Sequence, residues 1–355
     1  RGITMINFLQ KSINNKGRAY FFLALATLSV VLLTGTMKAA VGFLLIFGTP
    51  LYFMEKMHDY STTGERFTRY VFLVISASVL IFLIAPVLII MPLSFNAEPY
   101  FTFTDGMLSF DSEAYSARWY LDILHNGMKA PEAIEGWWSD MWNNAQWVRA
   151  ARNSFFIATV SAIIATTLGT LAALGLSRPE MPQRALITSL LISPMIVPLV
   201  ITATGMFFFY SSIGIAKTYT GVILAHVTLG VPFVIITVTA TLSGFDMSLV
   251  RASQNMGANG WTTFRRIIMP LILPGMISGA LFAFITSLDE VVAVLFIADV
   301  EQRTIPRQMF SGIREQISPT ILAVASILVV MSVALLTVLE LLRRRSEKLR
   351  GMSPG

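Results

Sequence analysis

Eight long apolar runs constrain the fold of this chain more than any other feature of its sequence. They lie near 19–36, 38–54, 69–92, 153–176, 185–209, 218–242, 271–297 and 319–342. Their lengths match the roughly 17 to 25 residues that an α-helix needs to cross a bilayer. Only a short polar stretch around Lys38 separates the first two runs, which therefore form either a tight hairpin or one kinked, tilted segment. The sequence predicts an all-α polytopic membrane protein with about eight transmembrane helices.

Composition agrees with a membrane protein and argues against several other classes. Apolar residues make up 55% of the chain and charged residues 13%, whereas soluble domains have about 25% charged residues. There is no cysteine, and the three histidines are far apart in the sequence, so we expect no disulfide, zinc site or other metal site. Most bases flank the apolar runs, so the net charge of +6 indicates membrane orientation and not nucleic-acid binding.

The positions of lysine and arginine predict the orientation, because cytoplasmic loops are enriched in these residues. Bases precede the first and third runs, flank the turn near 178–184 and follow the last run. They are Lys11, Lys16, Arg18, Arg66, Arg69, Arg178, Arg184, Arg343, Arg344 and Arg345. We therefore expect both termini in the cytoplasm, with no cleavable signal peptide. The loop 299–318 runs against this rule, since it carries three arginines on the predicted outer side.

The only long segment between the runs, 93–151, falls on the predicted outer side and is acidic. It holds five of the six tryptophans, and Trp138 and Trp142 are one helical turn apart. Such spacing is typical of a helix that lies in the headgroup region of the bilayer. The alternative is a docking face for an external partner or a gate over a pathway.

A polar and basic stretch, "RASQNMGANGWTTFRRIIMPLILP" at 251–274, lies in the predicted cytoplasmic loop 244–269. Helix-favouring residues followed by Gly257 predict a short helix over about 247–256 that ends at the glycine. A short helix outside the membrane between two spans is suited to being gripped by another protein. The alternative is an ordinary basic cytoplasmic loop.

This stretch resembles the EAA loop of ABC-importer permeases, whose pattern is Glu-Ala-Ala, three residues, Gly, nine residues, Ile, any residue, Leu-Pro. The matching positions are a triplet, the glycine with the residue after it, and the final Ile-x-x-Pro: Arg251, Ala252, Ser253, Gly257, Ala258, Ile267 and Pro270. Arg251 in place of Glu and Ser253 in place of Ala are departures. Without the glutamate, the polar contact that this acid usually makes is not expected here. The docking role of the loop is still expected.

The resemblance covers residues 69–342 and is closest to the second permease of spermidine/putrescine-type importers. It rests on the order and spacing of several short motifs. These are "PLSFN" at 92–96, "RWY" at 118–120, "SPMIVP" at 193–198, "AHVTLGVPFVIITVTATLSGFD" at 225–246, "SLDEVVAVLFI" at 287–297 and "ISPTILAVASILVV" at 317–330. It implies a permease domain over 63–345 with a six-helix core. Extra membrane segments and a cytoplasmic loop occupy 1–62, and a cytoplasmic tail occupies 346–355.

The resemblance implies a non-enzymatic subunit of the bacterial inner membrane. In such importers two related permeases form the pathway, two cytoplasmic ATPase subunits grip the EAA loops, and an external binding protein delivers the substrate. ATP and Mg²⁺ then belong to the ATPases, and this chain lacks the Gly-x-x-x-x-Gly-Lys-Ser/Thr phosphate cradle. A polyamine is the favoured cargo, and amino-acid derivatives, opines and other small solutes stay open. The rivals are a secondary transporter or channel, and a membrane-embedded enzyme.

Polar groups within the apolar runs are the candidate substrate pathway. Asp289 and Glu290 interrupt the run 271–297 about 12 Å before its outer end, at about 1.5 Å per residue. Carboxylates at such depth are costly unless they face a cavity, a cation or a neighbouring helix. The second candidate is a group in the run 185–209, where paired prolines free backbone carbonyls: Ser193, Pro194, Pro198 and Thr202. A packed proline kink is the alternative for this group.

Overall fold

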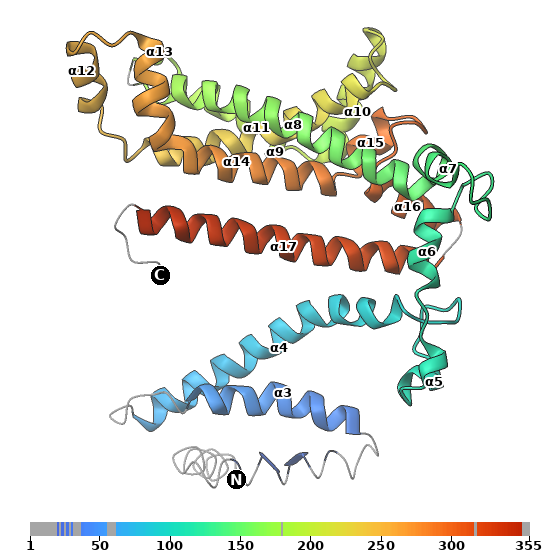
Figure 1. Cartoon of the computed structure of the whole chain (residues 1–355). Helices are drawn as coiled ribbons and strands as arrows, with labels where there is room; N and C mark the ends of the chain where they lie inside the picture. Colours follow the sequence, from blue (N-terminus) through green and yellow to red (C-terminus); the bar gives the residue numbers. More distant parts are fainter. Residues whose placement is uncertain are drawn as a thin grey trace. The chain divides into compact units, whose positions relative to one another are not determined.

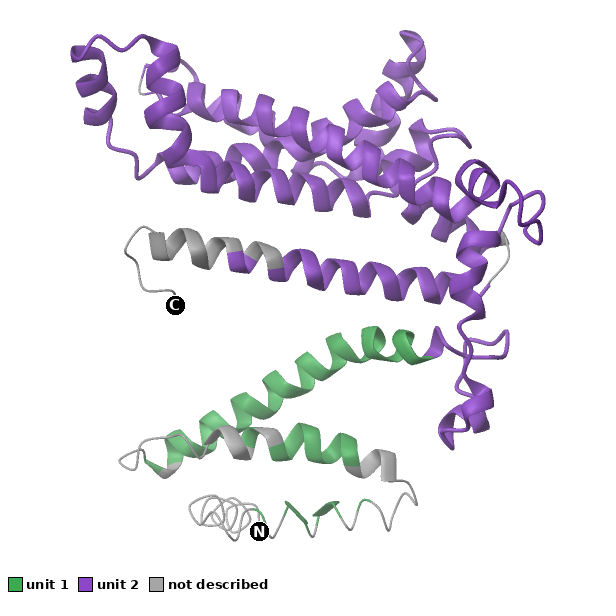
Figure 2. Ribbon diagram, in the orientation of Figure 1, with its two compact units in different colours: residues 1–92 green, residues 93–355 purple. Residues whose placement is uncertain are grey.

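The computed structural model describes residues 37–54, 62–178, 180–315 and 318–349, together with positions 20, 23, 24, 26, 27 and 30. It divides into two compact units, residues 1–92 and 93–355 (Figure 2). The described residues are mostly helical, and their one β-type pairing is an isolated bridge between Asn96 and Tyr115. The predicted all-α fold is therefore confirmed.

The first unit contains α3 (Met37–Met54) and α4 (Thr63–Leu93), which correspond to the predicted spans 38–54 and 69–92. A capping box starts α4: the Thr62 N–H donates to a Glu65 carboxylate oxygen at 2.9 Å, and the Glu65 N–H donates to the Thr62 hydroxyl at 3.3 Å. The Tyr70 hydroxyl donates to the Phe47 carbonyl at 3.3 Å and links the two helices. The predicted span 19–36 lies almost wholly outside the described residues.

Three long helices form the core of the second unit: α8 (Gln146–Leu176), α11 (Tyr219–Leu242) and α14 (Met269–Asp289) (Figure 1). Glycines and alanines allow them to pack closely. A Cβ atom added at Gly279 would lie 2.8 Å from the Cα of Val234 on α11, and one at Gly230 would lie 3.3 Å from the Ala165 side chain on α8. Small residues on these three helices therefore set how closely they approach.

Among the described residues, five helices are long and apolar enough to cross a membrane, or six if one bent pair counts as a span. The bent pair corrects the predicted span 185–209. It consists of α9 (Arg184–Ile196) and α10 (Leu199–Ser212), and the chain bends by 101° between them. Proline explains the break: Pro194 cannot donate the backbone hydrogen bond that would continue the helix, and Pro198 disfavours helical geometry at Val197.

The predicted span 271–297 also differs from the structure. A continuous helix runs over Gly260–Asp289 and stops there, and α15 (Val292–Ile297) is a separate helix. The continuous helix includes α13 (Gly260–Thr263) and the π-helical turn η2 (Phe264–Ile268) before α14. Chain direction changes at Glu290, whose backbone is extended at ψ 119°.

Short helices connect the long ones. They are α5 (Asp105–Leu108), η1 (Ser112–Ala114), α6 (Arg118–His125), α7 (Trp137–Asn144), α12 (Ser248–Asn255) and α16 (Ile305–Glu315). The last long helix, α17 (Thr320–Leu349), extends into the predicted tail 346–355. The helix expected around Trp138 and Trp142 is confirmed as α7, whereas its place in the headgroup region stays a prediction.

Two of the motifs that carry the family resemblance meet in the segment that follows α4. The Trp119 indole N–H donates to the carbonyl of the fully buried Asn96 at 2.8 Å. The Asn96 side-chain amide in turn donates to the carbonyls of Tyr100 and Thr102, both at 3.1 Å. "PLSFN" and "RWY" are therefore the structural anchor of this segment.

Candidate functional site

The loop predicted to dock another protein folds around α12 (Ser248–Asn255), close to the predicted 247–256. Gly257 follows with φ +82°, a left-handed conformation that favours glycine. The Gly257 N–H donates to the Gln254 carbonyl at 2.9 Å, and the Ala258 N–H donates to the Ser253 carbonyl at 3.0 Å. These two bonds form a Schellman motif that satisfies the last carbonyls of the helix. The glycine of the EAA-like pattern is thus the stop signal of α12.

Ser253, which replaces the second alanine of the EAA triplet, connects α12 to α13. Its side chain is buried, and its hydroxyl lies 2.9 Å from that of Thr263 on α13. It also donates to the Val250 carbonyl at 2.8 Å. Asn259 caps α13 by accepting from the Thr262 N–H at 2.8 Å. A serine at this position therefore adds a polar contact between the two short helices of the loop.

Several large apolar side chains of this loop face solvent. They are Met247, Leu249, Met256 and Trp261, with exposed fractions of 53%, 43%, 81% and 68%. Arg251 and Ala252, the first two triplet positions, are also exposed. Exposed apolar residues together with a basic group are typical of a protein-binding surface. We call this exposed set, Met247, Leu249, Arg251, Met256 and Trp261, the coupling surface.

The end of the EAA-like pattern leads directly into the membrane helix. Ile267 is half-buried in the π-helical turn, and Pro270 is the second residue of α14, directly after that turn. The helix from Gly260 to Asp289 has 30 residues, which corresponds to about 45 Å. The coupling surface and the Asp289–Glu290 pair therefore lie toward opposite ends of one helical element.

Asp289 and Glu290 differ in their surroundings. The sequence indicated that both residues interrupt a span. In the structure they lie at the end of a helix instead, because Asp289 is the last residue of α14 and Glu290 caps that helix. Glu290 is buried, and its Oε1 accepts from the Ala293 N–H at 2.8 Å, which stabilises the start of α15. Asp289 is exposed and makes no side-chain hydrogen bond or ion pair in the described part of the chain.

The proline-rich group lies at the bend between α9 and α10. The Ser193 hydroxyl donates to the Leu190 carbonyl at 2.7 Å, the carbonyl that Pro194 leaves without a helical N–H partner. Pro198 is the N-cap of α10, and Thr202 is half-buried in its first turn. Because the freed carbonyl is satisfied locally, these contacts favour the kink interpretation for Ser193 and Pro194.

The structure brings the two candidate pathway regions together through α15. This helix, which follows Glu290, packs on α10, which follows Pro198. Val294 and Ile297 of α15 are fully buried in a cluster with Ala203 and Tyr210 of α10. The bend and the acidic pair therefore share one packed neighbourhood, which the sequence alone does not show.

Sequence reasoning missed a set of buried polar residues that hold the loop after α15. The Asn153 amide donates to the carbonyls of Glu301 at 2.6 Å and Arg303 at 3.0 Å, and its oxygen accepts from the Tyr219 hydroxyl at 3.0 Å. The Ser154 hydroxyl accepts from the Ile305 N–H at 2.8 Å. The available signal in the sequence was that two adjacent polar residues, Asn153 and Ser154, begin the apolar run 153–176.

A second buried polar contact joins two core helices. His226 on α11 and Ser287 on α14 lie 2.6 Å apart, from Nδ1 to Oγ. Among the described residues, no group of three or more His, Asp or Glu side chains is arranged to hold a metal ion. The contact between His226 and Ser287 therefore links α11 to α14.

Comparison with known proteins identifies the family. Residues 165–348 match the family described as "Binding-protein-dependent transport system inner membrane component". The chain is 33% identical over 210 residues to the spermidine/putrescine transport system permease protein PotC of Haemophilus influenzae, covering 59% of this chain and 82% of PotC. It is 28% identical over 254 residues to the putrescine transport system permease protein PotI of Escherichia coli, covering 70% of this chain and 81% of PotI.

A solved structure supports the same fold. The crystal structure of a bacterial ABC transporter involved in the import of the acidic polysaccharide alginate aligns with a TM-score of 0.56 at 13% identity. The alignment covers 81% of this chain and 99% of that one. The resemblance found in the sequence is therefore confirmed. This chain belongs to the binding-protein-dependent transport system inner membrane components and is a permease subunit of an ABC importer.

Proposed function

We propose that this permease, together with a related second permease, forms the translocation pathway for a polyamine-like cation. The names of two relatives, a spermidine/putrescine permease and a putrescine permease, support this cargo. The exposed carboxylate of Asp289 at the end of α14 supports a cationic cargo independently. An amino-acid derivative, an opine or another small solute carried by the same machinery is the alternative.

The energy source in this proposal is a pair of cytoplasmic ATPase subunits that bind the coupling surface. ATP and Mg²⁺ are bound by those subunits, and this chain performs no catalysis. The observation that carries this assignment is the EAA-like loop, with α12 stopped by Gly257 and large apolar side chains facing solvent. Arg251 offers a positive charge where the family pattern has an acid, so we expect an acidic group opposite it on the ATPase.

Movement of the loop reaches the pathway through a helix. The continuous helix Gly260–Asp289 begins beside α12 and ends at the acidic pair. Because rigid helices transmit displacement along their length, closure of the ATPases shifts the Asp289 end and opens or closes the pathway there. An external binding protein delivers cargo to the segment 93–151, and both termini lie in the cytoplasm.

The chemistry at Asp289 follows from the cost of removing an ammonium group from water. A carboxylate in a low-dielectric pathway offsets that cost, and its attraction is stronger there than at a hydrated surface. Glu290 has a different role, because its carboxylate is buried and caps α15. In this proposal the Asp289 carboxylate interacts with the cargo, and Glu290 holds Asp289 in position.

Initial uptake of labelled putrescine and spermidine by the complete transporter in vesicles tests this proposal. We expect Asp289→Asn to slow uptake about tenfold, in line with the loss of one charged hydrogen bond. Glu290→Gln keeps an acceptor for the Ala293 N–H, so we expect a smaller loss. Glu180→Gln removes an exposed acid that makes no side-chain hydrogen bond to a described residue, in the turn between α8 and α9, and serves as the matched control.

Protein amount and basal ATP hydrolysis are measured in parallel with uptake. Unchanged polyamine uptake in Asp289→Asn would reject the cationic pathway and favour a neutral or anionic cargo. Uptake that continues in ATP-depleted vesicles would instead indicate a secondary transporter or channel. Loss of assembly in Asp289→Asn would assign that residue a structural role.

A further inference from the structure

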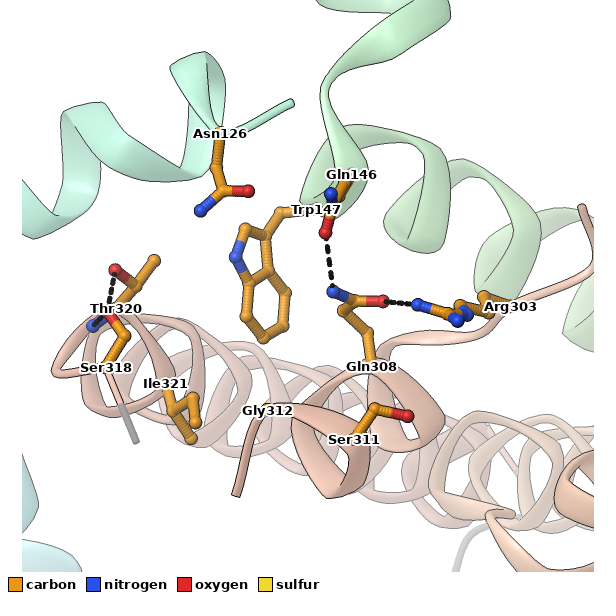
Figure 3. Close-up of a pocket in the computed structure, with 10 residues that line it drawn as sticks. All are labelled: Asn126, Gln146, Trp147, Arg303, Gln308, Ser311, Gly312, Ser318, Thr320 and Ile321. Carbon is orange, nitrogen blue, oxygen red and sulfur yellow. Dashed lines mark hydrogen bonds between the residues drawn. The ribbon is translucent and has the colours of Figure 1, made fainter. Parts of the chain in front are cut away.

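A cavity of about 420 Å³ lies in the second unit, bounded by the start of α8, by α16 and by the start of α17 (Figure 3). Its volume is in the range of small-ligand sites. Most of its lining is polar, and it contains the cationic side chain of Arg303. Nothing in the transport proposal requires a cavity at this place.

Hydrogen bonds hold the cationic wall of this cavity in place. Gln308, buried on α16, donates to the Gln146 side-chain oxygen at 3.1 Å and accepts from an Arg303 guanidinium N–H at 3.3 Å (Figure 3). The Arg303 carbonyl accepts from the Asn153 amide at 3.0 Å. Side chains from α8 and α16 therefore orient Arg303 before any ligand arrives.

Arg303 lacks a countercharge among the residues that the structure describes. Its Nε is buried without a hydrogen-bond partner, and within the described part of the chain no carboxylate lies within 4.0 Å of its guanidinium. Arg307, in the first turn of α16, adds a second positive charge near Arg303: burial, followed by the charge of Arg303, lowers the pKa of Arg307. A partly buried cation without a partner is unfavourable, and a bound anion would relieve that cost.

Other donors around the cavity are also free. The Trp147 indole N–H, which can only donate, makes no hydrogen bond to any described residue. The side-chain NH₂ of Gln146 makes none to a described residue either, and the Gln146 side-chain oxygen already accepts from Gln308. Asp122 beside the opposite wall already accepts from Thr320 at 2.5 Å and from Asn126 at 3.5 Å. Unused donors and an unpaired cation together select a ligand rich in acceptors.

We propose that this cavity is a binding site for an oxyanion, a carboxylate or phosphate group, with Arg303 as its charge partner. The planar guanidinium matches both groups, since its parallel N–H donors bind two oxygens at once. The group belongs either to a soluble metabolite-sized anion or to a lipid headgroup. In both cases it connects α8, α16 and the start of α17.

The test uses the purified full chain in phosphatidylcholine nanodiscs, titrated with inorganic phosphate and with citrate at constant ionic strength. We expect saturable binding by isothermal calorimetry and a matching rise in the melting temperature. Arg303→Gln should weaken binding about tenfold or more, as expected for the loss of a charged hydrogen bond. Arg314→Gln, on α16 but exposed and outside the cavity, is the matched control and should bind normally.

A second variant keeps the test valid if Arg303→Gln fails to fold. Trp147→Phe keeps the aromatic ring but removes the indole N–H, and should weaken binding about threefold or more, the lower end for one hydrogen bond. A rise in melting temperature that appears only in phosphatidylglycerol nanodiscs, and depends on Arg303 or Trp147, identifies a lipid phosphate as the oxyanion. The proposal is overturned if neither anion nor the anionic lipid has an effect that depends on these residues, or if Arg314→Gln loses as much binding as Arg303→Gln.

Discussion

Single residues determine the shape of the coupling surface, and Gly257 is the clearest example. A Cβ atom at this position would meet nothing within 4 Å, so space does not require glycine here. Its φ of +82° does, because a β-carbon in the left-handed region costs about 1–2 kcal/mol. The φ angle of Gly257 therefore determines the position of Met256 and of the exposed end of α12.

Replacing Gly257 should uncouple transport. We expect Gly257→Val to reach the membrane in normal amounts and to lose most uptake and most stimulation of ATP hydrolysis, because the loop no longer presents α12 correctly. Gly257→Asn should retain more activity, since asparagine tolerates the left-handed region better. Gly244→Val is the control, because Gly244 is equally open and has no positive φ. Full uptake and full ATPase stimulation in Gly257→Val would show that the docking assignment is wrong.

Asp140 ties the loop before α7 to that helix. Its carboxylate accepts from the backbone N–H of Ala130 at 2.8 Å, from the Asn144 side chain at 2.7 Å and from the backbone N–H of Lys129 at 3.0 Å. These bonds lower the pKa of Asp140 below its ordinary value of 3.8, and the bond from Ala130 has the largest effect. Because the folded pKa lies below the unfolded one, the stabilisation is complete above about pH 3.8 and is lost as the pH falls through the folded pKa.

Amide hydrogen exchange measures this dependence. After correction for intrinsic exchange, we expect protection of the Ala130 amide to be constant from about pH 7 to pH 5 and to fall below about pH 3.8. Asp140→Asn should reduce this protection already at neutral pH. Asp105→Asn, which alters an exposed acid without side-chain hydrogen bonds in the same segment, should leave it unchanged. Protection that stays high in Asp140→Asn would contradict the role of Asp140.

Helix packing in the second unit depends on glycine at the contact between α11 and α14. A Cβ atom at Gly279 would lie 2.6 Å from the Thr237 hydroxyl and 2.8 Å from the Val234 Cα. The first atom can rotate away, but the second belongs to the backbone, so α14 would have to move. Gly279 therefore fixes the separation of the two helices.

Gly279→Ala should destabilise the second unit by about 1–3 kcal/mol, the usual cost of overpacking a close contact. Thermal unfolding in detergent, followed by circular dichroism, measures this loss. Gly205→Ala on α10 is the control, because a Cβ atom there would meet nothing within 4 Å. A Gly279→Ala protein as stable as Gly205→Ala would mean that the helices are not packed this closely.

The orientation of the whole chain can be tested directly, because the sequence contains no cysteine. Met256 and Ile134, with exposed fractions of 81% and 97%, are suitable positions for single cysteines. We expect a membrane-impermeant maleimide to label Met256→Cys only in inside-out vesicles and Ile134→Cys only in right-side-out vesicles. The ATPase subunits should protect Met256→Cys and leave Ile134→Cys reactive. The reverse labelling pattern would invert the orientation predicted from lysine and arginine.

Much of the architecture was predictable from the sequence because it depends on local properties. The free energy of burying a residue in a bilayer is nearly independent of its distant neighbours, so the apolar runs identified the helices of the second unit. The short helix ending at Gly257 was predictable for the same reason, since a glycine stop is a local signal. The family resemblance was equally readable from the order of short motifs.

The tertiary structure decided where the apolar runs break and which polar residues meet. Hydropathy does not distinguish a straight span from the pair α9 and α10, which is bent by 101°, because both arrangements are equally apolar. The different surroundings of Asp289 and Glu290 depend on a helix that ends between them and on the packing of α15 against α10. The contact between Gln146 and Gln308 joins residues far apart in the sequence. Local patterns carry no information on such contacts, because each forms only when distant helices pack together.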